Sequence, residues 1–262
     1  MKQKRHLASL VKRRNLSVDN VDIVMVSKDD SFMMGESSLA NVDCNVNLEK
    51  VGNNRDFLPV VYNRYIRKHR ESKDVDYLIL QHGDVSYDAK HLFRRLDETK
   101  GKYDVIGLCG ASKITVSYTP LNWWCGSNPY PEEKWGCVTH GQDGGHMSFY
   151  NFHHPEVNDR EVAIIDGLCI ILTKDLIENT DILFDERFMW DFYDTDFCWN
   201  AIFNYHKNIG VIVEKSLKHF SIGVGILATT FLDNEIIFRD KWKLDSTKRL
   251  DEYKSKKKDQ SN

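Results

Sequence analysis

The sequence lacks several features that mark specialised classes of protein. No apolar run in its 262 residues reaches the ~18 that a membrane-spanning helix needs. The basic start, MKQKRHLASLVKRRN, has no apolar core of the kind found in secretory signals. The formal net charge of −3 argues against a protein whose main role is to grip nucleic acid. Without internal repeats or low-complexity linkers, the chain is long enough to bury a full core as one large domain, with or without an appendage.

Paired cysteine motifs are also absent. The six cysteines include no CxxC pair, and Cys109, Cys169 and Cys198 lie inside apolar patterns. Cysteines in such positions are typical of buried, reduced thiols rather than disulfides. We therefore expect a reducing, cytoplasmic location.

Short apolar runs alternate with helical patterns along most of the chain. Strands are predicted at 21–27, 75–81, 103–109, 163–173 and 209–221. Helices are predicted over 57–69, where Pro59 fits the first turn, and over 90–98. This alternation predicts an α/β fold with a mainly parallel central sheet, flanked by helices and joined by right-handed crossovers.

Residues 112–160 break the alternation. They are rich in Gly, Trp, His and Asn and show no clear period, which indicates a long binding loop or lid. Trp123 and Trp124 offer flat apolar faces that suit a sugar, although plain loop packing explains them equally well. A tetrahedral zinc site is a weaker alternative, because the spacing of its four ligands matches no common zinc module. Those ligands would be Cys125, Cys137, His140 and His146.

Three regions follow from this pattern. Residues 1–20 form a basic segment, 21–235 the main domain, and 236–262 a charged helix and tail. Residues 1–15 carry one apolar stripe that could touch an anionic membrane surface as a peripheral contact, although a short solvated helix packed on the body is the more ordinary interpretation.

Polar side chains follow the strand at 75–81. In open α/β sheets ligands bind beyond the carboxyl ends of the strands, and His82 and Asp84 stand just past such an end. An acidic residue there commonly holds a divalent cation, which in turn holds a phosphate. The alternative is a simple turn at Gly83, with Asp84 capping the following helix.

The segment FDERFMWDFYDTDFCWNA, residues 184–201, combines five acidic residues with many aromatic ones. A helix is predicted to begin near residue 195. Asp194 is then either its N-cap or a general base whose pKa is raised by burial among the aromatic rings. Asp196 is either a first-turn carboxylate favoured by the helix dipole or a second candidate for the base.

His219 follows the last predicted strand. A single histidine in this position is more often structural, but paired with Asp84 across a cleft it becomes a candidate metal ligand.

Seven blocks stand in order between residues 20 and 225. They are DYLILQHGDV, YDVIGLCG, the Trp/Gly loop, AIIDGLCIILTK, FDERFMWDFYDTDFC, IGVIV and KHFSIG. In order and spacing they resemble the family-2-like glycosyltransferases of GT-A fold, and VGNNRDFLPVVYNRYI resembles the Asn-containing helix after the second strand of these enzymes. The resemblance implies an inverting transferase that moves a sugar from a nucleoside-diphosphate sugar to a hydroxyl of a glycan, lipid-linked or protein-linked acceptor.

The resemblance also implies roles for individual residues. HGD stands where the family has an Asp-x-Asp motif, and His82 replaces the first acid of that motif. The resemblance therefore implies that Asp84, together with His219, binds Mn²⁺ or Mg²⁺. YDTD stands where the family has its acidic catalytic block, so Asp194 is implied as the base and Asp196 as its neighbour. By position alone, the contacts to the donor nucleotide would be Ser27, Asn53, Asn54, Asn63, His82 and Asp84. The acceptor or sugar pocket would comprise Trp123, Trp124, Asp166, Gly167, Trp190 and Tyr193.

Two other functions remain open on sequence grounds. A nucleotidyltransferase also places a cation and acidic residues at strand ends of an α/β sheet. A catalytically silent module that binds nucleotide or carbohydrate gains weight from the histidine in HGD.

Overall fold

The computed structural model describes residues 18–32, 35, 39, 42, 44–71, 75–121, 131–141, 148–151, 157–221 and 229–259. Four residues singled out above, Trp123, Trp124, Cys125 and His146, lie outside these ranges, as does the basic segment 1–17. No helix in the described part of the chain combines the length and the apolar character that crossing a bilayer requires.

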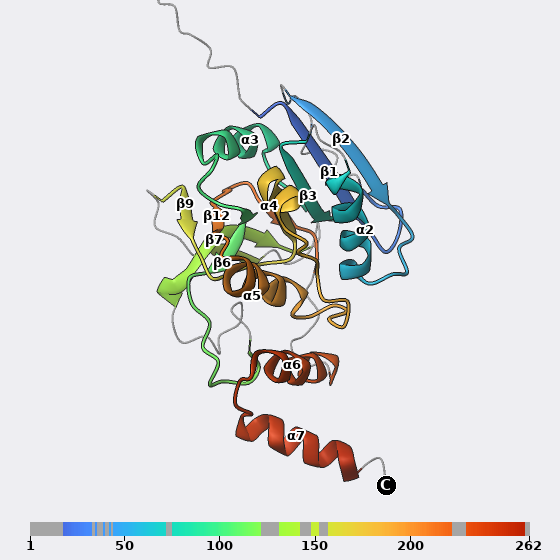
Figure 1. The fold of residues 1–262 in the computed structure, drawn as a ribbon, viewed down its shortest axis with the longest axis vertical. Helices are drawn as coiled ribbons and strands as arrows, with labels where there is room; N and C mark the ends of the chain where they lie inside the picture. The colour runs from blue at the N-terminus through green and yellow to red at the C-terminus, as the bar shows by residue number, and fades with distance from the viewer. Residues whose placement is uncertain are drawn as a thin grey trace, which may run out of the picture.

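A seven-stranded sheet forms the centre of the fold (Figure 1). Its strand order is β2 (Asn45–Val51), β1 (Asn20–Val26), β3 (Tyr77–His82), β11 (Cys169–Thr173), β5 (Val105–Gly107), β12 (Ile209–Ile212) and β9 (Asp159–Glu161). β2, β1 and β3 run parallel, as do β5 and β12, whereas β11 runs antiparallel to both of its neighbours. The predicted α/β class, with a central sheet flanked by helices, is confirmed, and the antiparallel strands β11 and β9 make the sheet mixed rather than mainly parallel.

A second, smaller sheet lies beside the first. Its order is β10 (Ile164–Ile165), β6 (Cys109–Ala111), β7 (Lys134–His140), β13 (Lys218–His219) and β4 (Val85–Ser86), with β8 (Ser148–Asn151) pairing β7. Three predicted strands, 103–109, 163–173 and 209–221, are therefore each divided between the two sheets. The predicted loop over 112–160 is wrong in part, because β7, β8 and the start of β9 fall within it.

The described residues form six helices. They are α2 (Leu58–Arg70), α3 (Ala89–Glu98), α4 (Lys174–Asn179), α5 (Tyr193–Tyr205), α6 (Thr229–Trp242) and α7 (Lys248–Asp259), and a 3-10 turn, η1, spans Pro131–Glu133. The two helices predicted at 57–69 and 90–98 are confirmed as α2 and α3. Pro59 lies in the first turn of α2, and the Asp88 side chain caps α3 by accepting from the His91 N–H. The boundary predicted after residue 235 falls inside α6.

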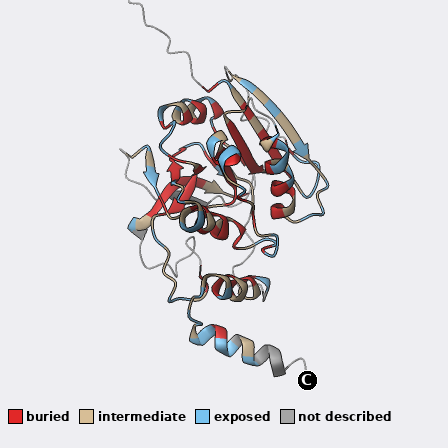
Figure 2. Cartoon of the chain, viewed as in Figure 1, coloured by how far each residue is buried: buried red, intermediate tan, exposed pale blue. Residues whose placement is uncertain are grey.

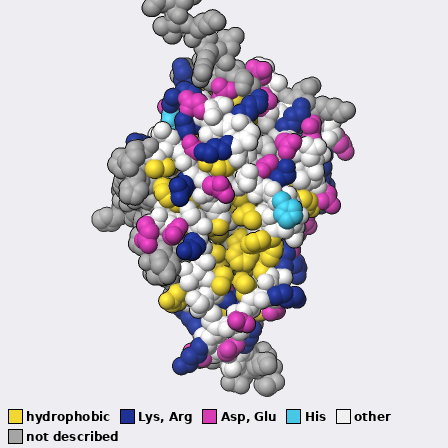
Figure 3. Space-filling view, turned by 60° about the vertical axis from the view of Figure 1, so that its left-hand side comes forward, with side chains coloured by type: hydrophobic (Ala, Val, Ile, Leu, Met, Phe, Trp, Pro, Cys, Tyr) yellow, Lys and Arg dark blue, Asp and Glu magenta, His cyan; other side chains and the backbone are white. Residues whose placement is uncertain are grey.

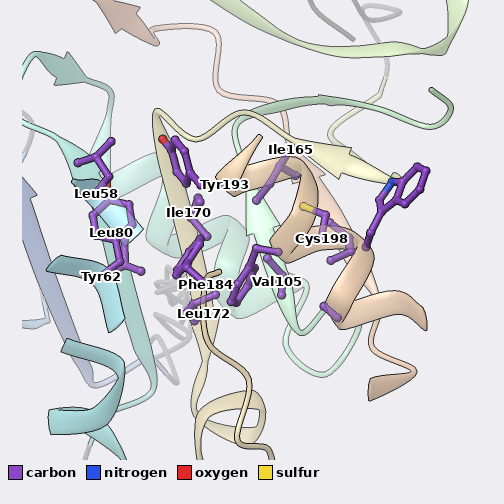
Figure 4. Close-up of a cluster of buried hydrophobic side chains, with 14 of the residues drawn as sticks. Leu58, Tyr62, Leu80, Val105, Ile165, Ile170, Leu172, Phe184, Tyr193 and Cys198 are labelled. Carbon is purple, nitrogen blue, oxygen red and sulfur yellow. The ribbon is translucent and has the colours of Figure 1, made fainter. Parts of the chain in front are cut away.

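Buried side chains pack on both faces of the central sheet (Figure 2). On one face, residues of β3 and β11 meet α2, α5 and the 182–188 segment. Figure 4 shows Tyr62, Ile170, Phe184, Tyr193 and Cys198 within this cluster. Cys109, Cys169 and Cys198 are buried reduced thiols, as predicted.

The aromatic residues of the 184–201 segment belong mainly to this core. Phe184, Phe188, Phe192 and Phe197 are all buried, and Phe192 packs against Phe238 of α6 with ring centroids 5.1 Å apart. These four rings therefore do not line a substrate pocket. They instead fix α5 and α6 to the sheet by burying large apolar areas.

Hydrophobic side chains also gather in one area of the surface, shown in yellow in Figure 3. Phe203 of α5 is 57% exposed and packs edge-on against Trp199, while Trp242 at the end of α6 contacts both rings. This aromatic group continues the core outward along the α5–α6 contact.

Candidate active site

The carboxyl ends of the parallel strands β2, β1 and β3 lie at one edge of the sheet. Backbone hydrogen bonds tie their loops together: Gly83 N–H donates to Val26 O over 2.9 Å, and Asn54 N–H donates to Ser27 O over 3.0 Å. Ser27, Asn53, Asn54, His82 and Asp84 are therefore gathered at the edge where open α/β sheets bind ligands.

Loop side chains at this edge bond to one another. Ser27 Oγ donates to Asp29 Oδ1 over 2.8 Å, and Asn53 Nδ2 donates to Asp30 Oδ2 over 2.5 Å. Asn53 has a φ of 48°, in the left-handed region that asparagine tolerates. These bonds hold the two loops in one conformation at the sheet edge.

Asn63 lies elsewhere. It is 1% exposed, donates to Phe184 O and Glu186 Oε1, and accepts from the Phe184 N–H. The residue that sequence suggested as a nucleotide contact thus holds the 184–186 backbone against α2 instead.

His82, Asp84 and His219 form a cluster, and one ligand atom from each lies within 4.8 Å of the others. The second sheet creates this cluster, because β13 pairs antiparallel with β4 and Phe220 N–H donates to Asp84 O over 2.9 Å. His219 Nε2 lies 3.5 Å from Asp84 Oδ1. Ligand atoms on one metal ion are about 3 to 4 Å apart, so small side-chain movements would close this cluster around a cation.

The protonation states of the cluster suit a cation. Burial lowers the pKa of His82 to about 4, and the neighbouring His219 adds to this shift, so the imidazole is neutral at pH 7. Burial alone would raise the pKa of Asp84, but the hydrogen bond and charge of His219 lower it below its usual value. The buried Nδ1 of His219 has no hydrogen-bond partner among the described residues. A neutral imidazole, an ionised carboxylate and an unsatisfied ring nitrogen together fit a divalent metal ion.

His140 extends the cluster. It stands opposite His219 in the parallel pairing of β7 and β13, and the two ring centroids are 5.0 Å apart in an edge-on arrangement. Burial, helped by His219, lowers the pKa of His140 to about 4. In the zinc hypothesis His140 was grouped with Cys125 and His146, whereas the structure places it beside His219.

The turn at residues 166–168 lies between this cluster and helix α5. On one side Leu168 O accepts from the His82 N–H over 3.1 Å. On the other side Gly167 N–H donates to Asp194 Oδ2 over 2.9 Å. The turn therefore connects Asp194 to the backbone of His82 through these two hydrogen bonds. Asp166, whose Oδ1 accepts from the Leu168 N–H over 2.9 Å, belongs to the same turn.

Tyr193 provides a second link between α5 and His82. Its hydroxyl lies 3.3 Å from His82 Nε2, and a methyl group placed on Gly167 would come within 1.9 Å of that oxygen. Tyr193 and Gly167, both predicted to lie in the sugar pocket, are thus brought together with His82.

Asp194 has the electrostatic character of a general base. Burial raises its pKa to about 7, and the negative charge of Asp166 adds to the shift, although N–H donors from Thr195 and Gly167 oppose it. Burial likewise raises the pKa of Asp166. Asp194 is not the N-cap of α5, which begins at Tyr193 after Phe192 in a left-handed conformation with a φ of 68°.

Asp196 faces away from this site. It is 1% exposed, accepts from Lys241 Nζ over 2.7 Å and from Trp242 Nε1 over 2.9 Å, and so anchors the end of α6. The suggestion that Asp196 shares the role of the base has no support in this geometry, because both of its oxygens bond to α6.

The other acids of the 184–201 segment also have partners in the fold. Asp185 bonds Arg187 and Lys241, and Glu186 bonds Asn63. Asp191 forms a hydrogen bond with Asn234, and burial raises the pKa of Asp191. Four of the five acids are thus explained by anchoring, and Asp194 is the one that bonds to the 166–168 turn.

Trp190 lies at the rim of the same edge. It is 43% exposed, packs edge-on against Phe57 with centroids 5.9 Å apart, and has Lys28 Nζ 4.5 Å from its ring centroid. Sequence reasoning missed Lys28, which directly follows Ser27 and is a cation available at the edge.

Comparison with known proteins gives weak similarity. No family model and no curated protein matches the chain. Among solved structures, A197 from STIV has 16% identity and a TM-score of 0.43, over 77% of this chain and 86% of that one. S. aureus TarS 1-349, also solved in complex with UDP, has 12% identity and a TM-score of 0.44, over 77% of this chain and 60% of that one. Since all these scores lie below 0.5, we argue function from the side chains.

Proposed function

We propose that this protein is a metal-dependent glycosyltransferase. It moves a sugar from a nucleoside-diphosphate sugar to a hydroxyl acceptor with inversion at the anomeric carbon. The observation that carries the proposal is the 166–168 turn, which bonds to His82 on one side and to Asp194 on the other. The turn thereby links the candidate cation cluster to a carboxylate of raised pKa, and this reaction would use both.

Asp84, His219 and His82 would hold a divalent cation, with Mn²⁺ and Mg²⁺ as the first candidates. When bound, the cation stabilises the negative charge that develops on the leaving diphosphate. Lys28 stands at the same edge and adds positive charge for the phosphates. Ser27, Asn53 and Asn54 would contact the nucleotide from the loops after β1 and β2.

Asp194 takes the proton of the acceptor hydroxyl as that oxygen attacks. A pKa of about 7 makes it a stronger proton acceptor than an ordinary aspartate and leaves about half of it ionised at pH 7. The two N–H bonds to its oxygens fix the direction of the carboxylate. A positioned base of this kind contributes roughly 10²–10⁴-fold in rate.

Gly167, Tyr193 and Trp190 are proposed to shape the sugar and acceptor site. Gly167 leaves room for the Tyr193 hydroxyl, which in turn contacts His82. Trp190 offers an exposed aromatic face at the rim, suited to stacking on a sugar ring. The acceptor would be a glycan or glycoconjugate.

A two-stage experiment tests this function. A thermal-shift screen of nucleotide sugars, each with and without Mn²⁺, identifies the donor, because a ligand far above its Kd stabilises the folded state by a few kcal/mol. The donor is then incubated with candidate acceptors. We expect nucleoside diphosphate to be released in the wild type and release to be lost in Asp194→Asn, with nucleotide binding retained.

The other outcomes are informative. Release of pyrophosphate from a nucleoside triphosphate would establish a nucleotidyltransferase and contradict the proposal. Nucleotide binding without turnover, unchanged by Asp194→Asn, would indicate a silent binding module.

A further inference from the structure

The last strand of the central sheet has an open edge. β9 pairs with β12 and with no other strand of the described residues, and the strand order of the sheet ends there (Figure 1). An unpaired edge presents backbone N–H and C=O groups to which another extended chain can bond. Three strands separate β9 from β3, so this edge is distinct from the candidate active site.

The pairing with β12 shows which backbone groups of β9 are left over. Val162 N–H donates to Ile209 O over 3.0 Å, which fixes the alternation of hydrogen-bonded pairs along β9. Arg160 therefore bonds to β12, whereas Asp159 and Glu161 direct their backbone groups outward. These two residues present two N–H and two C=O groups at the open edge.

A cavity of about 650 Å³ lies along this edge. Its lining comes from both faces of the sheet, because Tyr103 belongs to the core on the α3 side, whereas Val162 and Ile202 belong to the core on the α5 side. Side chains of a strand added to the edge would point alternately to the two faces. The cavity therefore has room on each face for the side chains of an extended chain.

The side chains at the edge alternate in charge. Arg160 is exposed, and its Cζ lies 5.0 Å from the centroid of the Trp135 ring, which holds the guanidinium in place. Glu161 is exposed and points to the other face. Asp159 shares that face but accepts from the Tyr103 hydroxyl over 2.8 Å and from two cationic side chains, so its charge is already compensated. A ligand would therefore meet the charges of Arg160 and Glu161.

A second copy of this chain fits the edge badly. A twofold axis would pair β9 antiparallel with itself, and an axis at Arg160 would place this residue opposite its own copy and Asp159 opposite Glu161. An axis at Asp159 or Glu161 would instead place a carboxylate opposite its own copy. Because like charges directly opposite each other destabilise a strand pair, the edge fits a chain of different sequence.

We propose that β9 binds an extended segment of a partner protein as an additional antiparallel strand. The segment carries an acidic residue opposite Arg160 and a basic residue opposite Glu161, and its backbone bonds to Asp159 and Glu161. In this mode of recognition the backbone hydrogen bonds give affinity and the alternating side chains give specificity. The proposal does not depend on the proposed function.

Two synthetic peptides of identical composition test the proposal. In the antiparallel direction, Thr-Val-Lys-Glu-Thr-Val-Thr places its Lys opposite Glu161 and its Glu opposite Arg160, and Thr-Val-Glu-Lys-Thr-Val-Thr exchanges the two charges. Nuclear magnetic resonance titration of the isotope-labelled full-length protein measures binding. We expect the first peptide to bind about tenfold more tightly and to shift the amide signals of Asp159 and Glu161.

Variants of the protein test the charges. Arg160→Glu combined with Glu161→Arg should reverse the preference between the two peptides, and both side chains are exposed, so the fold should be kept. Arg64→Glu is the matched control, since the Arg64 side chain is 60% exposed on α2, and this change should leave the preference as it is.

Modified peptides test the backbone contact without any change to the protein. The N–H of the peptide Lys faces the Glu161 carbonyl, so a methyl group on that nitrogen should abolish binding. The N–H of the peptide Glu points away from β9, so a methyl group there should leave most of the affinity.

Equal binding of the two peptides, or no binding of either at about 2 mM, would overturn the proposal. Binding that is insensitive to the methyl group on the Lys nitrogen would also overturn it. A galacturonate hexamer that binds at Arg160 when neither peptide does would assign the cavity to an acidic glycan instead. Shifts of the same amide signals with protein concentration alone would assign the edge to a second copy, and either result contradicts the proposal.

Discussion

At the scale of single residues, Asp194 combines two opposing influences. Burial and the charge of Asp166 disfavour its ionised form, whereas the Gly167 and Thr195 N–H groups favour it, and the balance raises its pKa to about 7. The other titratable groups that face it are Tyr193 and Cys198, and burial raises the pKa of each. Ionising Asp194 therefore costs folding free energy, and in the proposed function the resulting carboxylate acts as the base.

The first prediction concerns pH. Because Asp194 must be ionised to accept a proton, the rate of transfer should rise through pH 7 and level off above about pH 8. The pKa is raised on folding, so the stabilising contribution of this group is present below about pH 4 and is lost as the pH rises through 7. Asp194→Asn should thus abolish turnover, and between pH 5 and pH 8 its stability relative to the wild type should change in favour of the variant by on the order of 1–3 kcal/mol.

Urea unfolding at pH 5 and pH 8 measures this effect. The free energy of unfolding of Asp194→Asn, relative to that of the wild type, should be higher at pH 8 than at pH 5. An equal effect at both pH values would show that Asp194 has the pKa of an ordinary aspartate.

The second prediction concerns Gly167. A methyl group there would lie 1.9 Å from the Tyr193 hydroxyl and 2.4 Å from the ring carbon that bears it, so Gly167→Ala must push the buried ring away from His82. We expect a stability loss of about 1–3 kcal/mol, as for other overpacked sites, together with loss of turnover. Thermal melts and the transfer assay measure both. Tyr193→Phe in the same background should recover part of the stability, and no recovery would argue against this contact.

At the scale of elements, helix α6 is held by buried ionic contacts as well as by aromatic packing. Arg239, 3% exposed, bonds Glu235 and the carbonyl oxygens of Val116, Tyr118 and Asp245. Lys241 and Trp242 bond Asp196 of α5. α6 therefore ties the 116–121 segment to the helix that carries Asp194.

The third prediction follows from this arrangement. Arg239→Met should destabilise the protein by about 3–5 kcal/mol, because Glu235 would remain buried without its cation. Arg94→Met is the matched control, since the Arg94 side chain is 55% exposed and its pair with Glu98 contributes about 1 kcal/mol or less. Urea midpoints give both values, and equal losses would contradict the role of α6.

Elements also differ in how far the sequence predicts them. α2 and α3 have clear helical periods and N-terminal signals, and β1 and β3 are continuous apolar runs, so all four were predictable. β2 is an edge strand whose side chains are exposed or half-buried, and it carries no such run. β7 could not be predicted from the sequence, because it contains Gly136, which has a φ of 119° and lies too close to the Leu108 carbonyl for any side chain. A pattern within one segment carries no information about such a contact.

At the scale of the whole molecule, the site depends on two sheets meeting. His82 and Asp84 were predictable because a strand ends beside them. His219 approaches them because β13 pairs with β4, and His140 approaches His219 because β7 pairs with β13. No local sequence signal predicts these long-range pairings. The same limit explains Asp196 and Asn63, because their partners lie far along the chain, in α6 and in the 182–188 segment respectively.

The fourth prediction is a coupling between ligands. If the cation joins Asp84 and His219 to the diphosphate, Mn²⁺ should raise the affinity for nucleoside diphosphate, and the nucleotide should raise the affinity for Mn²⁺ by the same factor. Isothermal titration calorimetry in both orders measures the two factors, and Asp84→Ala should reduce the coupling to about one. Coupling that survives in Asp84→Ala would place the cation elsewhere.

The most direct test of the whole account is a crystal structure with Mn²⁺ and the nucleoside diphosphate of the donor identified by thermal shift. We predict an anomalous Mn²⁺ peak about 2.0–2.4 Å from Asp84 and His219, with the diphosphate on its open side and Asp194 facing the same cavity. A peak at any other cluster, or a nucleotide bound on a face that Asp194 does not reach, would contradict the account.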